Sequence, residues 1–383
     1  MKLKCSRVQL FEALTNVSKA VPSKSNIPAL EGIKLGLSEN SLELTGYDLE
    51  LGIRTRIEAE TSDNGEFVVN SRLFSEIIRR MSSDEVSIEV DEKLNVSITG
   101  KSATYDISAI SAAEYPDFPD IPSTESIDVP QYILKNMIDH TNHAVATNEN
   151  KPILTGELFD IEDGLFRMVA IDGFRLAVRS EKIICNSNYN FVVPGKTLNE
   201  ISKLLSKNET EKEENENQKD PVKEEICKIF VEPKKIIFQI SDYCVVSRLL
   251  EGEFHSYKTS IPNDFKNEII LKTKDFIDSV DRCSLLISEK NKCPIRCVFE
   301  EGILKIDCKT TVGKINDSIA AEVSGDRIEI GFNHKYLADA LKACDTDKIK
   351  IQLLANNKPV KILPVAGDSF LYLLMPIQLK SSY

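Results

Sequence analysis

One stretch of sequence returns twice in this chain at long intervals. FVVNSRLFSEII at residues 67–78 recurs 124 positions later as FVVPGKTLNEIS at residues 191–202, and a fainter copy, IGFNHKYLADAL, occupies residues 330–341. Each copy places a β-rich run directly before apolar residues at helical spacing. Solenoid repeats are only about 20 to 50 residues long. The long interval therefore predicts three copies of a whole domain.

The rest of each third supports this triplication. Apolar residues at helical spacing open the thirds, within residues 6–20, 131–146 and 273–287. A pair of β-rich runs around a turn follows each of these helices. The second helices begin near Ser71, Gly195 and His334. We predict an α+β fold of three repeated domains, each with two helices packed on antiparallel sheet.

Two proline-bearing stretches, AAEYPDFPDIP and EGEFHSYKTSIP, indicate linkers with boundaries near residues 123 and 263. The predicted domains are therefore residues 1–123, 124–263 and 264–383. Within the second domain, residues 208–225 hold eight acidic residues and three lysines with almost nothing apolar. Because such a segment buries too little surface to order itself, a solvated loop is favoured over a docking site.

The composition limits the cellular compartments in which the protein could work. Nine cysteines without a CxxC pair favour buried, reduced thiols over disulfides or a zinc site. The N-terminus lacks the apolar core of a signal peptide, and no run approaches the roughly 18 to 20 apolar residues that span a bilayer. We expect a cytoplasmic protein with no membrane association, no metal and no cofactor.

The sequence PGKT at residues 194–197 resembles the end of a phosphate-binding loop. That motif needs a glycine five positions before Gly195, where this chain has Asn190. The matching positions of the other repeats read NSR and NHK, so glycine is not required there. We interpret these positions as the corner between a strand and a helix. Nucleotide binding at Gly195–Thr197 is therefore a weak hypothesis.

Two other groups of polar residues suggest chemistry without completing a site. His140 and His143 are spaced to share a helical face, but no third metal ligand is evident, which favours polar residues on an exposed face. Asp172 and Arg175 lie close together without a nucleophile. An enzyme that uses the Asp172–Arg175 region is accordingly disfavoured.

Charge is unevenly distributed, although the chain is acidic overall with a net charge of −12. The six predicted helices hold 13 lysines and arginines against 8 acidic residues, so the negative excess lies elsewhere in the chain. Helices that line one surface would form a basic face that attracts phosphate backbones. The alternative is that the helices simply carry charges of both signs. The first helix of the third repeat supports this alternative, because it holds Asp275, Asp278 and Asp281.

Several stretches occur in the order found in one known family. VPSKSNIPALEGIKL at 21–35, AIDGFRLAV at 170–178, EIGFNHKYLADAL at 329–341 and YLLMPIQL at 372–379 together resemble the bacterial DNA polymerase III beta subunit, the sliding clamp. The resemblance covers residues 1 to about 379. It implies a head-to-tail dimer of three-domain protomers, closed into a ring with helices inside and sheets outside. It further implies sequence-independent encirclement of duplex DNA and no enzymatic activity.

The resemblance also implies partners and the residues that meet them. The partners are the replicative polymerase alpha subunit, the clamp loader, repair polymerases and other proteins with a clamp-binding motif such as Gln-Leu-x-Leu-Phe, all at the nucleoid. The implied peptide pocket comprises Leu154, Gly173, Phe174, Arg175, Leu176, Asn333, Tyr336, Val360, Leu373, Leu374, Met375, Pro376 and Ile377. The implied DNA contacts are Lys24, Arg72, Arg79, Arg80, Lys151 and Lys196, and the implied protomer interface joins Tyr105 and Ile107 to Leu286 and Ile287.

Three residues depart from the family pattern. Phe174 stands where histidine is frequent, Lys292 where an aromatic residue can occur, and Gln378 where arginine is frequent. These departures leave the motif preference of the pocket open. A protein-only interaction scaffold of triplicated domains, which never encircles DNA, is the alternative function.

Overall fold

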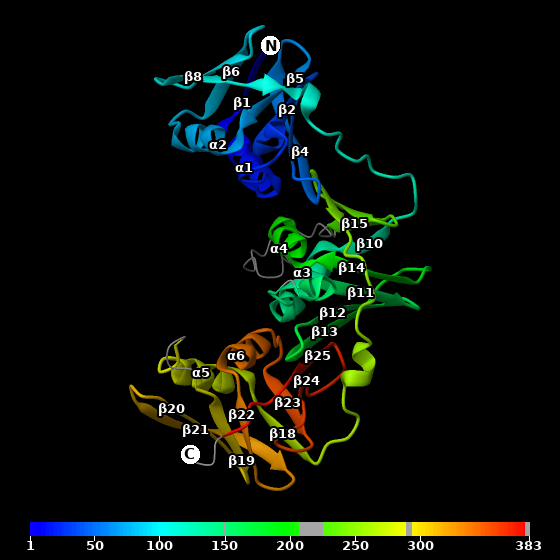
Figure 1. The fold of residues 1–383 in the computed structure, drawn as a ribbon, viewed down its shortest axis with the longest axis vertical. Helices are drawn as coiled ribbons and strands as arrows, with labels where there is room; N and C mark the ends of the chain where they lie inside the picture. The colour runs from blue at the N-terminus through cyan, green and yellow to red at the C-terminus, as the bar shows by residue number, and fades with distance from the viewer. Residues whose placement is uncertain (149, 207–224, 289–292, 380–383) are drawn as a thin grey trace, which may run out of the picture. The chain divides into compact units, whose positions relative to one another are not determined.

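The computed structural model describes residues 1–148, 150–206, 225–288 and 293–379 (Figure 1). The predicted loop 208–225, apart from Glu225, and the departure at Lys292 lie outside the described residues. The chain forms two compact units. Unit one comprises residues 1–135 and 200–249, and unit two comprises residues 136–199 and 250–383.

The first repeat runs strand, helix, four strands, helix, three strands. Its elements are β1 (Lys2–Ser6), α1 (Arg7–Val17), β2 (Gly32–Ser38), β3 (Ser41–Tyr47), β4 (Leu51–Thr61), β5 (Gly65–Asn70), α2 (Ser71–Arg80), β6 (Glu85–Val90), β7 (Asn95–Thr99) and β8 (Thr104–Ser108), followed by the short β9 (Ile110–Ser111). The predicted second helix thus begins at Ser71. Asn70 caps it by accepting a hydrogen bond from the backbone N–H of Leu73 at 2.9 Å.

The second repeat has the same series of elements. It comprises β10 (Ile127–Pro130), α3 (Gln131–Thr141), β11 (Gly156–Glu162), β12 (Leu165–Ile171), β13 (Arg175–Lys182), β14 (Tyr189–Pro194), α4 (Gly195–Leu204), β15 (Ile226–Val231), β16 (Lys235–Ile240) and β17 (Tyr243–Arg248). A Cβ atom on Gly195 would lie only 2.9 Å from Asn142 Oδ1 and 3.2 Å from the Thr155 carbonyl oxygen. This crowding at the corner explains the glycine of PGKT by packing.

The third repeat completes the triplication. It comprises β18 (Asn267–Lys272), α5 (Thr273–Ser284), β19 (Ile295–Glu300), β20 (Ile303–Lys309), β21 (Lys314–Ser324), β22 (Ile328–Phe332), α6 (His334–Lys342), β23 (Lys348–Leu353), β24 (Val360–Pro364) and β25 (Phe370–Leu374). Asn333 caps α6 as Asn70 caps α2, accepting from the Lys335 and Tyr336 N–H groups. The α+β fold of three repeats with antiparallel strands is confirmed.

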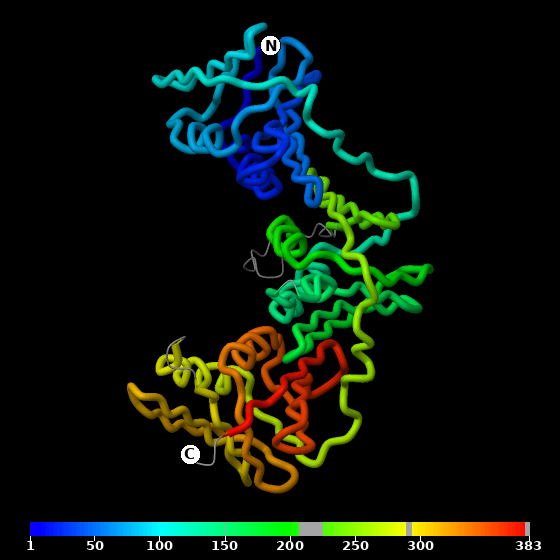
Figure 2. The backbone as a smooth tube through the Cα atoms, viewed as in Figure 1, coloured from blue at the N-terminus to red at the C-terminus, as the bar shows by residue number. Residues whose placement is uncertain are grey.

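Each unit contains one extended antiparallel sheet system, and the central repeat contributes to both. In unit one the strands follow the order β10-β15-β16-β17-β4-β1-β6-β7-β8, and a branch from β4 continues through β3, β2, β5 and β9. In unit two the order is β14-β11-β12-β13-β25-β24-β23-β18-β21-β20-β19-β22. In Figure 2 the last strand, β25, is the red segment near the C-terminal end of the tube, and it pairs with β24. The first four strands of each order belong to the second repeat, whereas the remaining strands belong to the first repeat in unit one and to the third repeat in unit two. Each sheet is therefore shared by two repeats.

The first helices of the three repeats bury residues at equivalent positions. In α1 these are Leu10, Ala13, Leu14 and Val17, each at most 1% exposed. The corresponding buried set in α3 is Leu134, Met137, Ile138 and Thr141, and in α5 it is Phe276, Ser279, Val280 and Cys283. This spacing of three, four and seven residues places one face of each helix on the core.

Two strand junctions join successive repeats in the same way. In unit one β17 pairs with β4, so that Val245 lies opposite Ile53. In unit two β25 pairs with β13, and Tyr372 lies opposite Ala177. A linker covers the outer face of each junction. Phe118 packs on Phe230, Ile237, Cys244 and Val246, while Phe254 and Tyr257 pack on Leu176, Val178, Leu371 and Leu373.

All nine cysteines are free thiols, and Cys185, Cys293 and Cys344 are the partly exposed ones. Among the described helices, none has the length and apolar character needed to cross a membrane.

Candidate functional site

A tight turn between β12 and β13 presents two residues of the predicted pocket. Asp172 Oδ1 accepts hydrogen bonds from the backbone N–H groups of Phe174 at 2.9 Å and Arg175 at 3.0 Å. Gly173, between them, adopts a φ of +92°, a conformation that residues with a Cβ atom rarely take. The turn therefore holds Phe174 outward, with 61% of its surface exposed.

Arg175 ties this turn to α6. Its Nε donates to Asp172 Oδ2 at 2.9 Å, and its Nη1 donates to Asp339 Oδ2 at 2.7 Å. The guanidinium carbon lies 4.3 Å from the centre of the Tyr336 ring. Only an arginine can form two directed ion pairs and stack on an aromatic ring at once. Arg175 is 8% exposed, so these contacts replace water almost completely.

An apolar shelf surrounds this ion-pair network. Phe174 stacks on Tyr336, with ring centres 6.3 Å apart and planes inclined by 27°. The end of the chain lies alongside, because the Met375 N–H donates to the Phe174 carbonyl and the Ile377 N–H to the Gly331 carbonyl, both at 2.8 Å. Met375 and Ile377 are 41% and 38% exposed. Clustered exposed apolar side chains of this kind mark a binding surface.

A cavity of about 630 Å³ opens beside the shelf. Five residues of the predicted pocket line it, namely Phe174, Arg175, Asn333, Tyr336 and Ile377. Leu176, Val360, Leu373 and Leu374 lie in the core, each at most 6% exposed, and Leu154, Gly173, Met375 and Pro376 do not line this cavity. The rest of the wall comes from residues that sequence reasoning missed: Val145, Ala146, Thr147, Asn148, Asp172, Ser288, Cys293, Pro294, His334 and Lys335.

The predicted DNA contacts all have exposed side chains, although they differ in their surroundings. Lys24 and Arg72 lie in unit one, and Lys151 and Lys196 lie in unit two. Arg79 and Arg80 both contact Glu76, at 2.7 and 3.3 Å, which offsets part of their charge. The assignment of all six residues as DNA contacts stays a prediction.

Of the four residues predicted at a protomer interface, two lie on an edge strand and two follow a helix. Tyr105 and Ile107 belong to β8, which ends the strand order of unit one. Leu286 follows α5 and lies near Gly313, at the start of β21, whereas Ile287 packs against the core. The neighbouring Leu285 is 83% exposed, more than either predicted residue. Sequence periodicity could not find it, because it follows the helix end.

The expectation that His140 and His143 lie on an exposed helix face was wrong. His143 packs edge-on against Tyr372, with ring centres 5.6 Å apart, and burial lowers the pKa of its imidazole to about 4. His140 Nε2 lies 3.9 Å from Asp345 Oδ2. The two rings contact the third repeat because α3 ends at the junction between repeats. Within the described ranges, no group of three or more potential ligands could hold a metal ion.

The threefold repeat, the shared sheets and the exposed apolar shelf define a protein of the sliding-clamp class. Three family models match in turn: the DNA polymerase III beta subunit N-terminal domain over residues 1–119, its central domain over 128–256 and its C-terminal domain over 258–378. This chain belongs to the DNA polymerase III beta subunit family. The family is non-catalytic and serves DNA replication.

Individual relatives agree along their whole length. The beta sliding clamp of Bacillus subtilis is 32% identical, over 99% of this chain and 100% of the relative. The crystal structure of the Bacillus subtilis sliding clamp superposes with a TM-score of 0.91 at 30% identity, covering 99% of this chain and all of the other. A Pseudomonas aeruginosa clamp bound to griselimycin gives 0.88 at 25% identity with the same coverage. The predicted boundaries near residues 123 and 263 stay a prediction.

Proposed function

We propose that two copies of this chain close head to tail into a ring that encircles duplex DNA and tethers the replicative polymerase to it. The observation that carries this proposal is a strand junction between repeats that occurs twice within the chain and lacks its third copy among the described strands. The junctions β17·β4 and β25·β13 are made within the chain, whereas β8 and residues 314–320 of β21 have no strand on their outer edge among the described elements. Joining these two edges between copies gives a heterologous contact, and a contact of this kind forms a ring when the rotation between copies closes.

Topological retention tests the ring directly. The protein is loaded onto nicked circular DNA by a clamp loader and passed through a sizing column at moderate salt. A ring stays on the circle and leaves when the DNA is linearised, because nothing then blocks its escape. A protein-only scaffold gives no retention on either form, and retention on linear DNA points to ordinary binding instead.

The exposed basic residues support sequence-independent contact with the DNA backbone. Changing Lys24, Arg72 and Lys196 together to glutamate is expected to lower the slope of log binding constant against log salt by about 0.9 per residue, because each lost phosphate contact releases one counterion fewer. The measurement is duplex binding by fluorescence anisotropy at several salt concentrations. Lys93→Glu, in the exposed turn between β6 and β7, is the matched control. An unchanged slope in the triple variant would argue against these contacts.

The shelf and cavity suit a short apolar peptide from a partner. We place the clamp-binding motifs of the polymerase alpha subunit, the clamp loader and repair polymerases here, and the chain itself at the nucleoid in the cytoplasm. The griselimycin-bound relative encourages this assignment. Phe174, Met375 and Ile377 offer exposed apolar area, and a flexible methionine adapts to different partners.

Tyr336→Ala is expected to weaken binding of a peptide carrying Gln-Leu-x-Leu-Phe by about 30-fold, as for a buried aromatic hot spot. The reason is that Tyr336 supports both the Phe174 ring and the Arg175 guanidinium. Titration calorimetry measures the affinity. Phe265→Ala, an exposed aromatic residue of the same unit, should leave it unchanged. Equal affinity in wild type and Tyr336→Ala would place the peptide elsewhere.

A further inference from the structure

One thiol lies in the wall of the cavity beside the shelf. Among the described residues that line this cavity, Cys293 contributes the only sulfur atom. Its side chain is partly exposed, whereas Cys283, Cys297 and Cys308 of the same repeat are fully buried. A small solute that enters the cavity therefore meets Cys293 before the other three thiols.

A second thiol, that of Cys308, lies behind the first. The Cys293 side chain packs against the core that contains Cys308. Its Sγ donates a hydrogen bond to the carbonyl oxygen of Lys309, the residue after Cys308, at 3.0 Å. Burial, and then a hydrogen bond with the Cys293 thiol, raise the pKa of the Cys308 thiol to about 12. The two thiols are therefore in contact between the cavity and the core.

The backbone at Cys293 is not fixed by strand pairing. Cys293 precedes the first residue of β19 by two positions, and the β19–β20 ladder begins only where Arg296 lies opposite Asp307. A disulfide prefers Cα atoms about 5.5 to 6 Å apart. Because Cys293 lies outside the ladder, its backbone can adjust to this separation without breaking the sheet.

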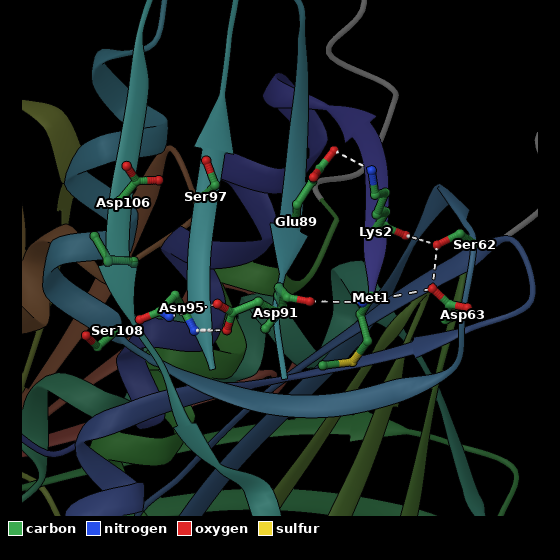
Figure 3. A pocket seen from close by; sticks show the side chains of 12 residues that line it. Met1, Lys2, Ser62, Asp63, Glu89, Asp91, Asn95, Ser97, Asp106 and Ser108 are labelled. Carbon is green, nitrogen blue, oxygen red and sulfur yellow. Dashed lines mark hydrogen bonds and ion pairs between the residues drawn. The ribbon is translucent and has the colours of Figure 1, made fainter. Parts of the chain in front are cut away.

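A second large cavity offers a contrast. It has a volume of about 880 Å³, lies beside the N-terminus and is lined mainly by acidic and hydroxyl side chains, among them Asp63, Glu89 and Asp106 (Figure 3). Its sulfur atom belongs to the thioether of Met1, which cannot form a disulfide. Of these two cavities, only the one beside the shelf combines an apolar binding surface with a thiol.

We propose that Cys293 and Cys308 form a reversible disulfide that regulates peptide binding at the shelf and cavity, a proposal that rests on the proposed peptide site. A peroxide oxidises the Cys293 thiol to a sulfenic acid, and its O–O bond breaks as one molecule of water leaves. The Cys308 sulfur then bonds to the Cys293 sulfur, and the sulfenic hydroxyl leaves with the Cys308 proton as a second molecule of water. A thiol reductant returns both cysteines to the reduced state.

The disulfide changes the wall on which the peptide packs. It removes the hydrogen bond from the Cys293 thiol to the Lys309 carbonyl and draws the Cys293 sulfur towards the core. Pro294, the next residue, lines the same cavity and moves with it. Because affinity in such a pocket depends on close packing, the oxidised chain binds the peptide more weakly.

Peptide mapping tests whether the bond forms. The full chain is treated with hydrogen peroxide, the remaining thiols are alkylated, and mass spectrometry should find the peptides that contain Cys293 and Cys308 crosslinked. Cys308→Ala should leave Cys293 as a sulfenic acid, which dimedone labels. Cys185→Ser removes another partly exposed thiol that does not line the cavity, and this matched control should keep the crosslink.

Peptide affinity tests the consequence. Titration calorimetry with the Gln-Leu-x-Leu-Phe peptide should show binding weakened about fivefold after oxidation, with recovery after dithiothreitol. Cys308→Ala should lose less than about twofold, because its Cys293 side chain stays in the wall. Peroxide also oxidises exposed methionines such as Met375, but dithiothreitol does not reverse a methionine sulfoxide. Recovery therefore assigns the loss to a thiol.

The outcomes separate the switch from the peptide site. Peptide binding by the reduced chain, without a crosslink between residues 293 and 308 after oxidation, overturns the switch and leaves the peptide site standing. A crosslink from Cys293 to a different thiol, such as Cys283, overturns the pairing. A crosslink between 293 and 308 that leaves affinity unchanged overturns the regulation. No binding by the reduced chain overturns the peptide site and the regulation together.

Discussion

Replacing Arg175 by methionine is expected to lower the free energy of unfolding of unit two by about 3 kcal/mol. Methionine fills similar volume, but it leaves the Asp172 and Asp339 carboxylates without the cation that holds them at 2.9 and 2.7 Å. Tyr336 loses the guanidinium on its face as well. Breaking a buried ion pair costs more than its formation contributes, because uncompensated charge remains.

The measurement is urea denaturation combined with amide hydrogen exchange in β13 and α6, which reports the stability of unit two separately. Arg72→Met, an exposed arginine of unit one, is the control and should change stability by less than about 0.5 kcal/mol. Arg175→Lys should fall between, since lysine keeps the charge and loses the two-pronged geometry. Equal stability of Arg175→Met and wild type would show that the network contributes nothing.

Glu157 is expected to make unit two less stable as pH rises. It is fully buried on β11, and desolvation raises its pKa to about 8 from an ordinary value near 4.5. Its hydrogen-bond partner is the hydroxyl of Thr141, which also lies 2.7 Å from the Met137 carbonyl oxygen, so the hydroxyl hydrogen is shared between two acceptors and offsets little of the desolvation. The folded chain therefore binds a proton that the unfolded chain has released over this range.

The sign follows from linkage. Because the folded state holds more protons between about pH 4.5 and 8, unfolding becomes easier as pH rises through this window, by about 5 kcal/mol in total. Glu157→Gln should remove this dependence and stabilise the chain at pH 8. The comparison is urea denaturation at pH 5 and pH 8. Glu162→Gln, an exposed position at the end of the same strand, should keep the wild-type slope, and parallel slopes for wild type and Glu157→Gln would refute the assignment.

Local sequence patterns predicted most of the fold. The second helices begin at Ser71, Gly195 and His334 as expected, because a capped helix after a strand leaves a strong local signal. The predicted pairs of β-rich runs likewise form hairpins, each around a two-residue turn. These features depend on residues a few positions apart, which periodicity and turn chemistry describe well.

Features made by distant residues were not predicted. Arg175 and Asp339 are 164 positions apart, and no local pattern joins them. His140 and His143 were expected at the surface because they are polar, whereas both contact residues of the third repeat. Residues 145–148, together with Ser288, Cys293 and Pro294, enter the cavity wall from loops with no regular pattern. For the same reason, the sequence could not separate shelf residues such as Met375 from core residues such as Leu374.

The central repeat is divided between both units, and this division determines which fragments of the chain can fold alone. Its strands β10 and β15 to β17 belong to unit one, and β11 to β14 belong to unit two. A fragment that ends near residue 123 would leave β4 without β17, and one that begins near residue 264 would leave β25 without β13. The unit of gene duplication is thus not the unit of autonomous folding, so excised single repeats should aggregate through their bare strands.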